Sequence, residues 1–290
     1  MQSRLAELDR LDRRSAAPAR VGRHRRGVRR PRRGETVFVV GFMAIVAVLV
    51  FVRVSYPSVA SDSDRGWATH YPPLPVDAAA DRILPPVTAV STGAHAFGRT
   101  TADGRPVTYD PCRPIHYVVN TTGLPNRGLE LVRQAIGQIS AATGLTFTED
   151  GLSGESLVED REPLQERYGD RWAPVLIGWV DEVGFPLVSG DIAGIAGSIT
   201  VTPDGPGSER YVTGQVALDR DWFDEAVARP GGYPQARAVL MHELGHLVGL
   251  DHVADPGELM AESNSGVTEL GPGDRQGLAA VGAGRCWTDT

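Results

Sequence analysis

The sequence predicts an α+β domain over residues 109–290, and three features of this region lead to that prediction. Several short runs are rich in β-branched and aromatic residues, which is typical of strands. One run has apolar residues at helical spacing, and a second helical run carries two histidines four residues apart. The elements follow the order strand, helix, strands and helix, which favours a domain in which helices pack against a sheet.

Four strands and a first helix can be placed from these patterns. The strands are predicted at residues 115–120, 145–148, 175–180 and 215–219. The first helix is predicted at 129–139, where one face is apolar. A polar, acid-rich stretch at 149–170 lies between two strands, and we expect it on the surface.

The second helix contains the sequence His-Glu-Leu-Gly-His. Residues four apart on a helix lie on one face, so His242 and His246 present two imidazoles to one point. A hydrolytic zinc site usually takes three protein ligands and keeps a fourth position for water. His252 can supply the third ligand, because Gly249 can adopt a positive φ and turn the chain back. Glu243 lies beside the first ligand, where its carboxylate can act as general base without binding the metal.

Histidine spacing of this kind can also arise by chance. A lone histidine is usually a surface or core residue, and a His-x-x-x-His pair alone is moderate evidence for a metal site. The chain has only seven histidines. Meeting His, Glu, His, Gly and His at these five offsets by chance therefore has odds on the order of one in ten thousand. The spacing predicts one catalytic zinc ion.

The long motif His-Glu-x-x-His-x-x-Gly-x-x-His, followed by a methionine, resembles the metzincin metallopeptidases. Its ending Leu-Asp-His at 250–252 and the run 255–260 resemble the matrixin branch of that family. The resemblance implies a metzincin-like fold with a mixed, twisted sheet, a general base at Glu243 and a Met-turn with Met260 under the metal. It implies zinc ligands at His242, His246 and His252. An isolated methionine is otherwise more often core filler.

The resemblance also implies a substrate-binding strand. In the family, the strand at the position of 193–197 is the sheet edge that borders the cleft, where an extended substrate pairs as an added strand. This assigns Gly194, Ile195 and Ala196 to substrate binding, with the glycines leaving room for a peptide backbone. A flexible glycine-rich loop is the alternative.

Beyond the zinc motif, some parts of the chain match the family pattern and others depart from it. The stretch 270–282 resembles the last matrixin helix, with Asp274 early in it, where a carboxylate suits the helix dipole. Matrixins often bind a second, structural zinc through histidines before the edge strand, but 181–219 contains none, so one zinc is predicted. The family's usual Pro-x-Tyr beyond the Met-turn is replaced by Ala-Glu-Ser at 261–263. The preference for substrate side chains is therefore left open. Calcium binding is also left open, because four acids in loop-like surroundings could supply oxygen ligands: Asp181, Glu182, Asp191 and Asp204.

The N-terminal region has a different character from the rest. Residues 1–35 carry twelve arginines against four acids, a net charge of +8, which leaves the remainder at about −15. Residues 36–52 are uncharged and mostly apolar, and a helix of this length nearly spans a bilayer. We predict a transmembrane signal-anchor helix at 36–54, with the leader 1–35 in the cytoplasm and the zinc motif outside the cell membrane. The complete use of arginine in place of lysine suggests a bacterial genome rich in GC.

The N-terminal region has two alternative interpretations. Small residues ending at Ala60 could mark the cleavage site of a signal peptide, after which the protein would be secreted. The arginine cluster could bind nucleic acid, but its position against an apolar segment disfavours that, and no nucleic-acid partner is predicted.

Residues 55–108 are rich in proline, alanine and small polar residues and show no sustained period. We expect an extended stalk that holds the catalytic domain off the membrane, because proline favours polyproline II. A latency pro-segment is the alternative, but matrixin pro-segments carry a Pro-Arg-Cys-Gly-like motif, and this chain has none.

The chain has two cysteines, Cys112 and Cys286. Two cysteines in an exported domain usually pair, so we predict a disulfide between the start and the end of the domain. The alternative, in which Cys112 acts as a latency switch, would leave Cys286 unpaired.

These inferences together predict an extracytoplasmic zinc endopeptidase that acts on polypeptides. Two rivals remain: a non-catalytic exported binding module derived from a peptidase, and a zinc amidase that acts on a cell-wall polymer. Intact catalytic residues argue against the first rival. The predicted edge strand argues against the second, since it favours an extended peptide.

Overall fold

The computed structural model describes residues 71–263 and 266–289. The predicted leader, the predicted spanning segment and the first part of the predicted stalk lie outside these residues. Among the helices that the structure describes, none is both long enough and apolar enough to span a membrane.

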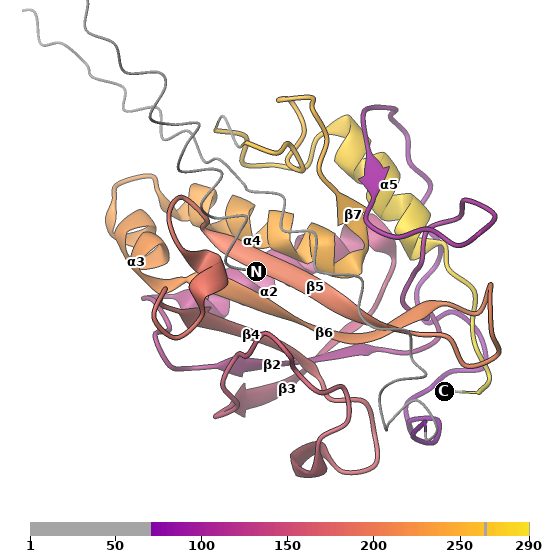
Figure 1. Ribbon diagram of the computed structural model, residues 1–290. Helices are drawn as coiled ribbons and strands as arrows, with labels where there is room; N and C mark the ends of the chain where they lie inside the picture. The colour runs from indigo at the N-terminus through magenta and orange to yellow at the C-terminus, as the bar shows by residue number, and fades with distance from the viewer. Residues whose placement is uncertain (1–70, 264–265, 290) are drawn as a thin grey trace, which may run out of the picture. The chain divides into compact units, whose positions relative to one another are not determined.

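Five strands form one mixed sheet in the order β3-β2-β4-β6-β5 (Figure 1). The strands are β2 (Ile115–Asn120), β3 (Phe147–Ser153), β4 (Val175–Val180), β5 (Gly194–Val201) and β6 (Arg210–Asp219). Strand β5 runs antiparallel to β6, and all other neighbours pair in parallel. The predicted mixed sheet is confirmed. The strand predicted at 145–148 begins two residues later, and the one predicted at 215–219 is the second half of β6.

Helices α2 and α4 cover one face of this sheet (Figure 1). The helices are α2 (Gly128–Thr143), α3 (Arg220–Ala228), α4 (Tyr233–Val248) and α5 (Pro272–Gly282), with short 3₁₀ turns η3 (Glu166–Tyr168) and η4 (Pro186–Val188). Helix α2 is the predicted amphipathic helix, and Leu131 and Ile139 on its apolar face are fully buried. Helix α3 was not predicted. Asp219 caps it by accepting a hydrogen bond from the Trp222 backbone N–H at 2.8 Å.

Strand β4 is buried on both faces of the sheet. Ile177 and Trp179 belong to the main core, which also contains the apolar faces of α2 and α4. Leu176 lies in a second, smaller core on the opposite face, with Leu157 and Phe185. A parallel strand that is covered on both sides reads as a continuous apolar run, as the sequence of β4 does.

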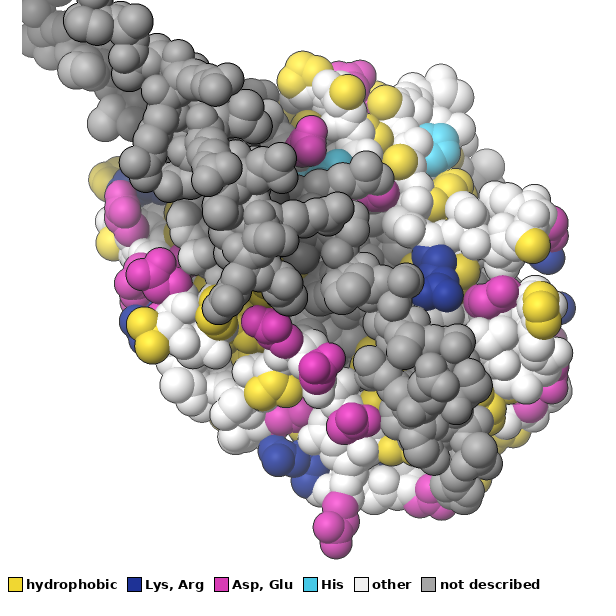
Figure 2. Space-filling view, viewed as in Figure 1, with side chains coloured by type: hydrophobic (Ala, Val, Ile, Leu, Met, Phe, Trp, Pro, Cys, Tyr) yellow, Lys and Arg dark blue, Asp and Glu magenta, His cyan; other side chains and the backbone are white. Residues whose placement is uncertain are grey.

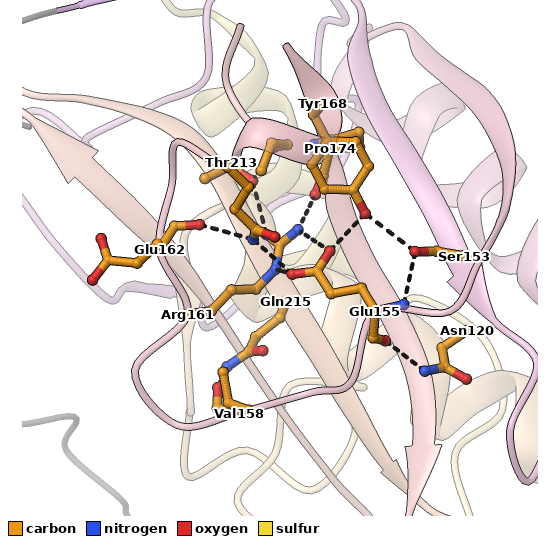
Figure 3. A network of polar contacts seen from close by, with 12 residues as sticks. Asn120, Ser153, Glu155, Val158, Arg161, Glu162, Tyr168, Pro174, Thr213 and Gln215 are labelled. Atoms are coloured by element: carbon orange, nitrogen blue, oxygen red, sulfur yellow. Dashed lines mark hydrogen bonds and ion pairs between the residues drawn. The ribbon is translucent and has the colours of Figure 1, made fainter. Parts of the chain in front are cut away.

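The acid-rich stretch between β3 and β4 departs from the expectation that it lies on the surface. Glu155 and Arg161 within it are only 5% and 4% exposed. They form an ion pair with 2.8 Å between Arg161 Nε and Glu155 Oε1 (Figure 3). Arg161 also donates to the Gly214 carbonyl of β6 at 3.0 Å, and Tyr168 donates to Glu155 Oε2 at 2.6 Å. The stretch is therefore partly interior, because paired charges can be buried beneath the sheet.

The described part of the predicted stalk, residues 71–108, packs against the domain instead of extending away from it. The Ala79 backbone N–H donates to the Cys112 carbonyl at 2.8 Å. Arg82 donates from Nη1 to the Gly282 carbonyl at the end of α5, at 2.7 Å. Further along, strand β1 (Ala96–Phe97) pairs with strand β7 (Leu250–Asp251). Backbone groups of a proline-rich segment can thus find partners on a folded domain, which composition alone did not indicate.

Cys112 and Cys286 form the predicted disulfide, with Cα atoms 5.3 Å apart. The bridge joins the segment just before β2 to the chain after α5. Next to it, Asp110 accepts hydrogen bonds from the backbone N–H groups of Cys112 at 2.8 Å and Trp287 at 3.0 Å. The two ends of the domain are therefore fastened by covalent and polar contacts together.

The surface of the domain carries the acidic charge that the sequence distribution predicts. Figure 2 shows Asp and Glu side chains spread over the described part of one face, with arginine at a few places. Such a surface attracts cationic rather than anionic partners over distances of about one Debye length.

Candidate active site

Helix α4 ends where the predicted motif requires a change of direction. Gly249 has a φ of 117°, and its backbone N–H donates to the carbonyls of Gly245 at 3.1 Å and His246 at 3.0 Å. A Cβ at Gly249 would lie 3.2 Å from the Val107 carbonyl oxygen, so the turn is crowded as well as left-handed. Only glycine adopts this conformation at little cost, and the turn brings His252 back toward the helix.

The three predicted histidines converge on one point. Their Nε2 atoms, in His242, His246 and His252, lie 3.1 Å from one another in all three pairs. A tetrahedral zinc ion with Zn–N bonds of about 2.0–2.1 Å holds its nitrogen ligands roughly 3.3 Å apart. The side-chain arrangement therefore matches the size of a zinc ion.

The outer nitrogens of two of these rings determine their tautomers. His242 Nδ1 lies 2.7 Å from the Leu259 carbonyl oxygen, and His246 Nδ1 lies 3.0 Å from the Leu250 carbonyl oxygen. Each Nδ1 must carry the proton, since a carbonyl oxygen can only accept. In the neutral rings, the Nε2 atoms of His242 and His246 then carry lone pairs that point at each other, so these two atoms cannot hydrogen bond to each other. A cation between them satisfies both, so the donor set fits a zinc ion.

Burial keeps the imidazoles of His242 and His246 neutral. The pKa of His242 lies well below its ordinary value, because burial and then the neighbouring His246 disfavour its charged form. The pKa of His246 is lowered to about 4, first by burial and then by His252. Neutral imidazole is the form that binds a metal, so the site is ready for one at neutral pH.

Glu243 follows His242 directly on helix α4, and its side chain touches the edge strand at Gly194. Its side chain is buried, and among the described residues Oε1 has no hydrogen-bond partner. A Cβ added to Gly194 would lie 2.8 Å from Glu243 Cγ, so this glycine makes room for the carboxylate. Burial raises the pKa of Glu243 to about 8. A buried carboxyl without a partner, beside a metal-binding cluster, is typical of a catalytic acid or base.

Met260 packs against Gly245 of helix α4. A Cβ added to Gly245 would lie 2.6 Å from Met260 Sδ, so the sulfur fills the space that this glycine leaves beside His246. The Val253 backbone N–H donates to the Met260 carbonyl at 3.0 Å. This bond links the segment after His252 directly to the turn.

Two buried carboxylates join the Met-turn to helix α5. Asp274 accepts from the backbone N–H groups of Leu259 at 2.5 Å and Met260 at 3.1 Å. In return, Glu258 accepts from the N–H groups of Gly273 at 2.8 Å and Asp274 at 3.0 Å, at the start of α5. Since the Leu259 carbonyl faces His242 Nδ1, Asp274 helps to place the acceptor that orients a ligand.

Sequence reasoning placed Asp274 only at a helix dipole and missed Glu258. One signal was present: α5 begins at Gly-Pro-Gly-Asp, and its N-cap, Gly271, has no side chain to accept the first N–H groups. Those groups needed an acceptor from elsewhere, but nothing in the sequence identified it.

The predicted edge strand is present as β5, which is the last strand of the sheet and pairs with β6. Gly194, Ile195 and Ala196 lie at its beginning, beside α4, so this segment is a strand and not a glycine-rich loop. A Cβ on its first glycine, Gly194, would collide with Glu243, so this glycine makes room for the carboxylate.

Groups of at least three metal-binding side chains within reach of one another occur twice among the described residues. One group is the three histidines; the other contains Asp110, Cys112 and Cys286, whose sulfurs form the disulfide. The four acids considered for calcium do not form such a group. In particular, Asp181 accepts from the Gly184 N–H at 2.8 Å and pairs with Arg220.

Comparison with known families agrees with this geometry. Residues 201–281 match the family model described as Matrixin, a span that includes α3, α4, the Met-turn and most of α5. No curated protein sequence matches the chain. The match supports a matrixin-like zinc metallopeptidase, and the five-stranded mixed sheet with its helices is consistent with a metzincin-like fold.

Proposed function

We propose that the protein is a zinc-dependent endopeptidase that acts outside the cytoplasm. The observation that carries this proposal is the set of three imidazole Nε2 atoms 3.1 Å apart, with the buried carboxylate of Glu243 on the same helical turn. Three imidazoles with a carboxylate beside them are the residues of a hydrolytic zinc site.

The reaction is the hydrolysis of a peptide bond. When bound by the three imidazoles, zinc supplies a Lewis acid for the scissile carbonyl and lowers the pKa of water towards about 7. Glu243 accepts a proton from the attacking water and passes it to the leaving amine. Its raised pKa of about 8 suits the second role, and a nearby cation favours the carboxylate form that the first role needs.

The substrate binds as an extended chain along β5. Among the described strands, β5 pairs only with β6, so the backbone groups along its other edge can bond to a polypeptide. Helix α4 packs beside β5, which places Glu243 next to Gly194 at the beginning of that edge. An added strand would therefore pass the reacting groups.

Two substitutions on one helical turn test these roles. Glu243→Ala leaves all three imidazoles in place, so the protein should retain about one zinc per chain but lose activity by roughly 10²- to 10⁴-fold. His246→Ala removes a ligand, so zinc and activity should disappear together. The measurements are metal content by elemental analysis and cleavage of an unfolded protein. Substantial turnover by zinc-loaded Glu243→Ala would rule out Glu243 as the general base.

The same assay separates the rival functions. A binding module would retain zinc but cleave nothing, and an amidase would cleave a cell-wall polymer but not an unfolded protein. Loss of proteolysis on adding a chelator, and its return with zinc, supports the peptidase.

The arginine-rich leader and the apolar segment at 36–54 lead us to propose a single-pass membrane protein of bacterial origin. Protease added to intact cells should degrade the catalytic domain and spare the Arg-rich leader at 1–35, because arginine-rich flanks stay in the cytoplasm. The check is immunoblotting with antibodies to each end of the chain. A mature protein that begins near Ser61 would show instead that a signal peptide is removed and the domain secreted.

A further inference from the structure

We propose that residues 91–98, here called the strap, position the zinc ligands of the active site. This inference rests on the proposed function for the identity of the metal. The strap lies outside the matched region 201–281 and within the segment whose composition indicated only a stalk. Figure 1 shows its strand β1 as a short purple arrow beside α5 and β7.

The strap pairs with the strand that leads to the third ligand. Ala96 lies opposite Asp251 and Phe97 opposite Leu250 in an antiparallel pair. The Gly98 backbone N–H donates to the Gly249 carbonyl at 3.0 Å, extending the pairing to the glycine that turns the motif. In the described part of the chain, β1 is the only strand that pairs with β7.

Strand β7 places two of the three ligands. The Leu250 carbonyl accepts from His246 Nδ1 at 3.0 Å, which holds that ring in the tautomer that binds metal. The Asp251 carboxylate accepts from the His252 backbone N–H at 2.8 Å, and His252 follows directly. A shift of β7 would therefore move one ligand and reorient another.

The other end of the strap reaches the support of the remaining ligand. The Gly93 N–H donates to Gln276 Oε1 of α5 at 3.1 Å. Gly93 also packs so closely on Gly273 that a Cβ there would overlap the Gly273 backbone nitrogen. Helix α5 carries Asp274, which holds the Leu259 backbone, and the Leu259 carbonyl faces His242 Nδ1. The strap thus contacts strand β7, next to His246 and His252, and helix α5, whose Asp274 holds the Leu259 backbone beside His242.

The burial of the strap residues indicates that the strap positions the ligands and contributes little to the stability of the domain. No residue of the strap is fully buried, and only Phe97 packs against the main core. Loss of the strap's contacts would therefore remove little apolar burial from the domain. It would release the short strand β7 from β1, its partner strand in the described part of the chain.

The experiment compares Gly98→Pro with Gly98→Ala in the full chain. Proline removes the N–H that bonds to the Gly249 carbonyl, whereas the Ala Cβ has room, because its nearest neighbour would be the Leu250 carbonyl oxygen at 3.6 Å. Zinc affinity is measured by competition with a chelator, and ligand geometry by the absorption spectrum of the cobalt-substituted protein. We expect Gly98→Pro to bind zinc about 10- to 100-fold more weakly, with a changed cobalt spectrum and an unchanged melting temperature of the zinc-free protein. Gly98→Ala should resemble wild type.

A second variant decides the matter if Gly98→Pro does not fold. In Gly93→Ala the added Cβ must push the strap away from Gly273, so zinc affinity should again fall while the zinc-free melting temperature holds. Wild-type zinc affinity in the folded variants would overturn the inference, as would a zinc-free melting temperature that falls in step with affinity. If the wild-type chain binds no zinc, the proposed function fails and the inference fails with it. If the wild type binds zinc and the folded variants keep its affinity, only the inference fails.

Discussion

Two glycines near the zinc ligands are required by the side chains that face them. Gly194 on β5 leaves space for Glu243, and Gly245 on α4 leaves space for Met260. A Cβ added to Gly194 would lie 2.8 Å from Glu243 Cγ, and one added to Gly245 would lie 2.6 Å from Met260 Sδ. Both distances are too short for a real Cβ. The position of the Glu243 carboxyl group therefore depends on the absence of one methyl group on strand β5.

Gly194→Ala should displace Glu243 while leaving the histidines in place. We expect peptidase activity to fall by about 10²-fold, since a displacement of about 1 Å at a reacting group has this effect, while zinc content stays near one per chain. Activity on an unfolded protein and elemental analysis provide the check. The matched control is Gly137→Ala on α2, where a Cβ would meet no atom within 4 Å and activity should not change. Full activity in Gly194→Ala would show that the carboxylate tolerates movement.

Among the elements, the segment between β3 and β4 contains a buried ion pair. Arg161 bonds to both oxygens of Glu155, at 2.8 and 3.0 Å, and to the Pro174 carbonyl at 2.8 Å (Figure 3). Burial alone would raise the pKa of Glu155, but hydrogen bonds from Arg161, Tyr168 and Gln165 lower it below the ordinary value. The pair therefore fastens this segment beneath the sheet only while the carboxylate is ionised.

Glu155→Gln should destabilise the domain in a pH-dependent way. A carboxyl with a lowered pKa in the folded state stabilises above its unfolded pKa of about 4.3, and that contribution is lost as the pH falls further. The variant should therefore lose about 3–5 kcal/mol of unfolding free energy at pH 7, because Arg161 is left buried and uncompensated. The deficit should narrow below about pH 4.

Urea unfolding at several pH values measures this deficit. Glu130→Gln is the matched control, since Glu130 forms an exposed pair with Arg127, and its stability should differ little from wild type at any pH. A deficit for Glu155→Gln that is the same at pH 4 and pH 7 would contradict the assignment.

At the scale of the whole molecule, the disulfide links the two ends of the domain and closes a loop that contains nearly all of its residues. Cys112 and Cys286 are 174 positions apart in sequence, and the bridge holds the chain after α5 against the start of β2. A neighbouring bond from the Trp287 N–H to Asp110 Oδ2, at 3.0 Å, fastens the same end. A link over so long a loop restricts the unfolded chain more than the folded one.

Replacing both cysteines by serine should lower the free energy of unfolding by about 2–5 kcal/mol. Zinc content should be unchanged, because the bridge lies at the ends of the domain and not among the ligands. Chemical denaturation of the variant measures the loss, and reduced wild-type protein should show a similar loss. Free thiols on both cysteines in the native protein, detected by mass spectrometry without reductant, would refute the prediction.

The sequence alone determined what depends on local spacing. His242 and His246 share a helical face because of the α-helical period, and Gly249 can turn the chain because it lacks a Cβ. The strands of the sheet and the amphipathic helix α2 were also predictable, since side chains alternate or recur with the period of the element.

The tertiary structure decided the contacts between segments distant in sequence. Gly194 faces Glu243 across 49 positions, and the strap meets β7 across about 150. The buried pair at Glu155 and Arg161 looked like a solvated acidic loop, because composition does not indicate whether the sheet covers it. Such contacts depend on which surfaces the fold brings together, so no local pattern can specify them.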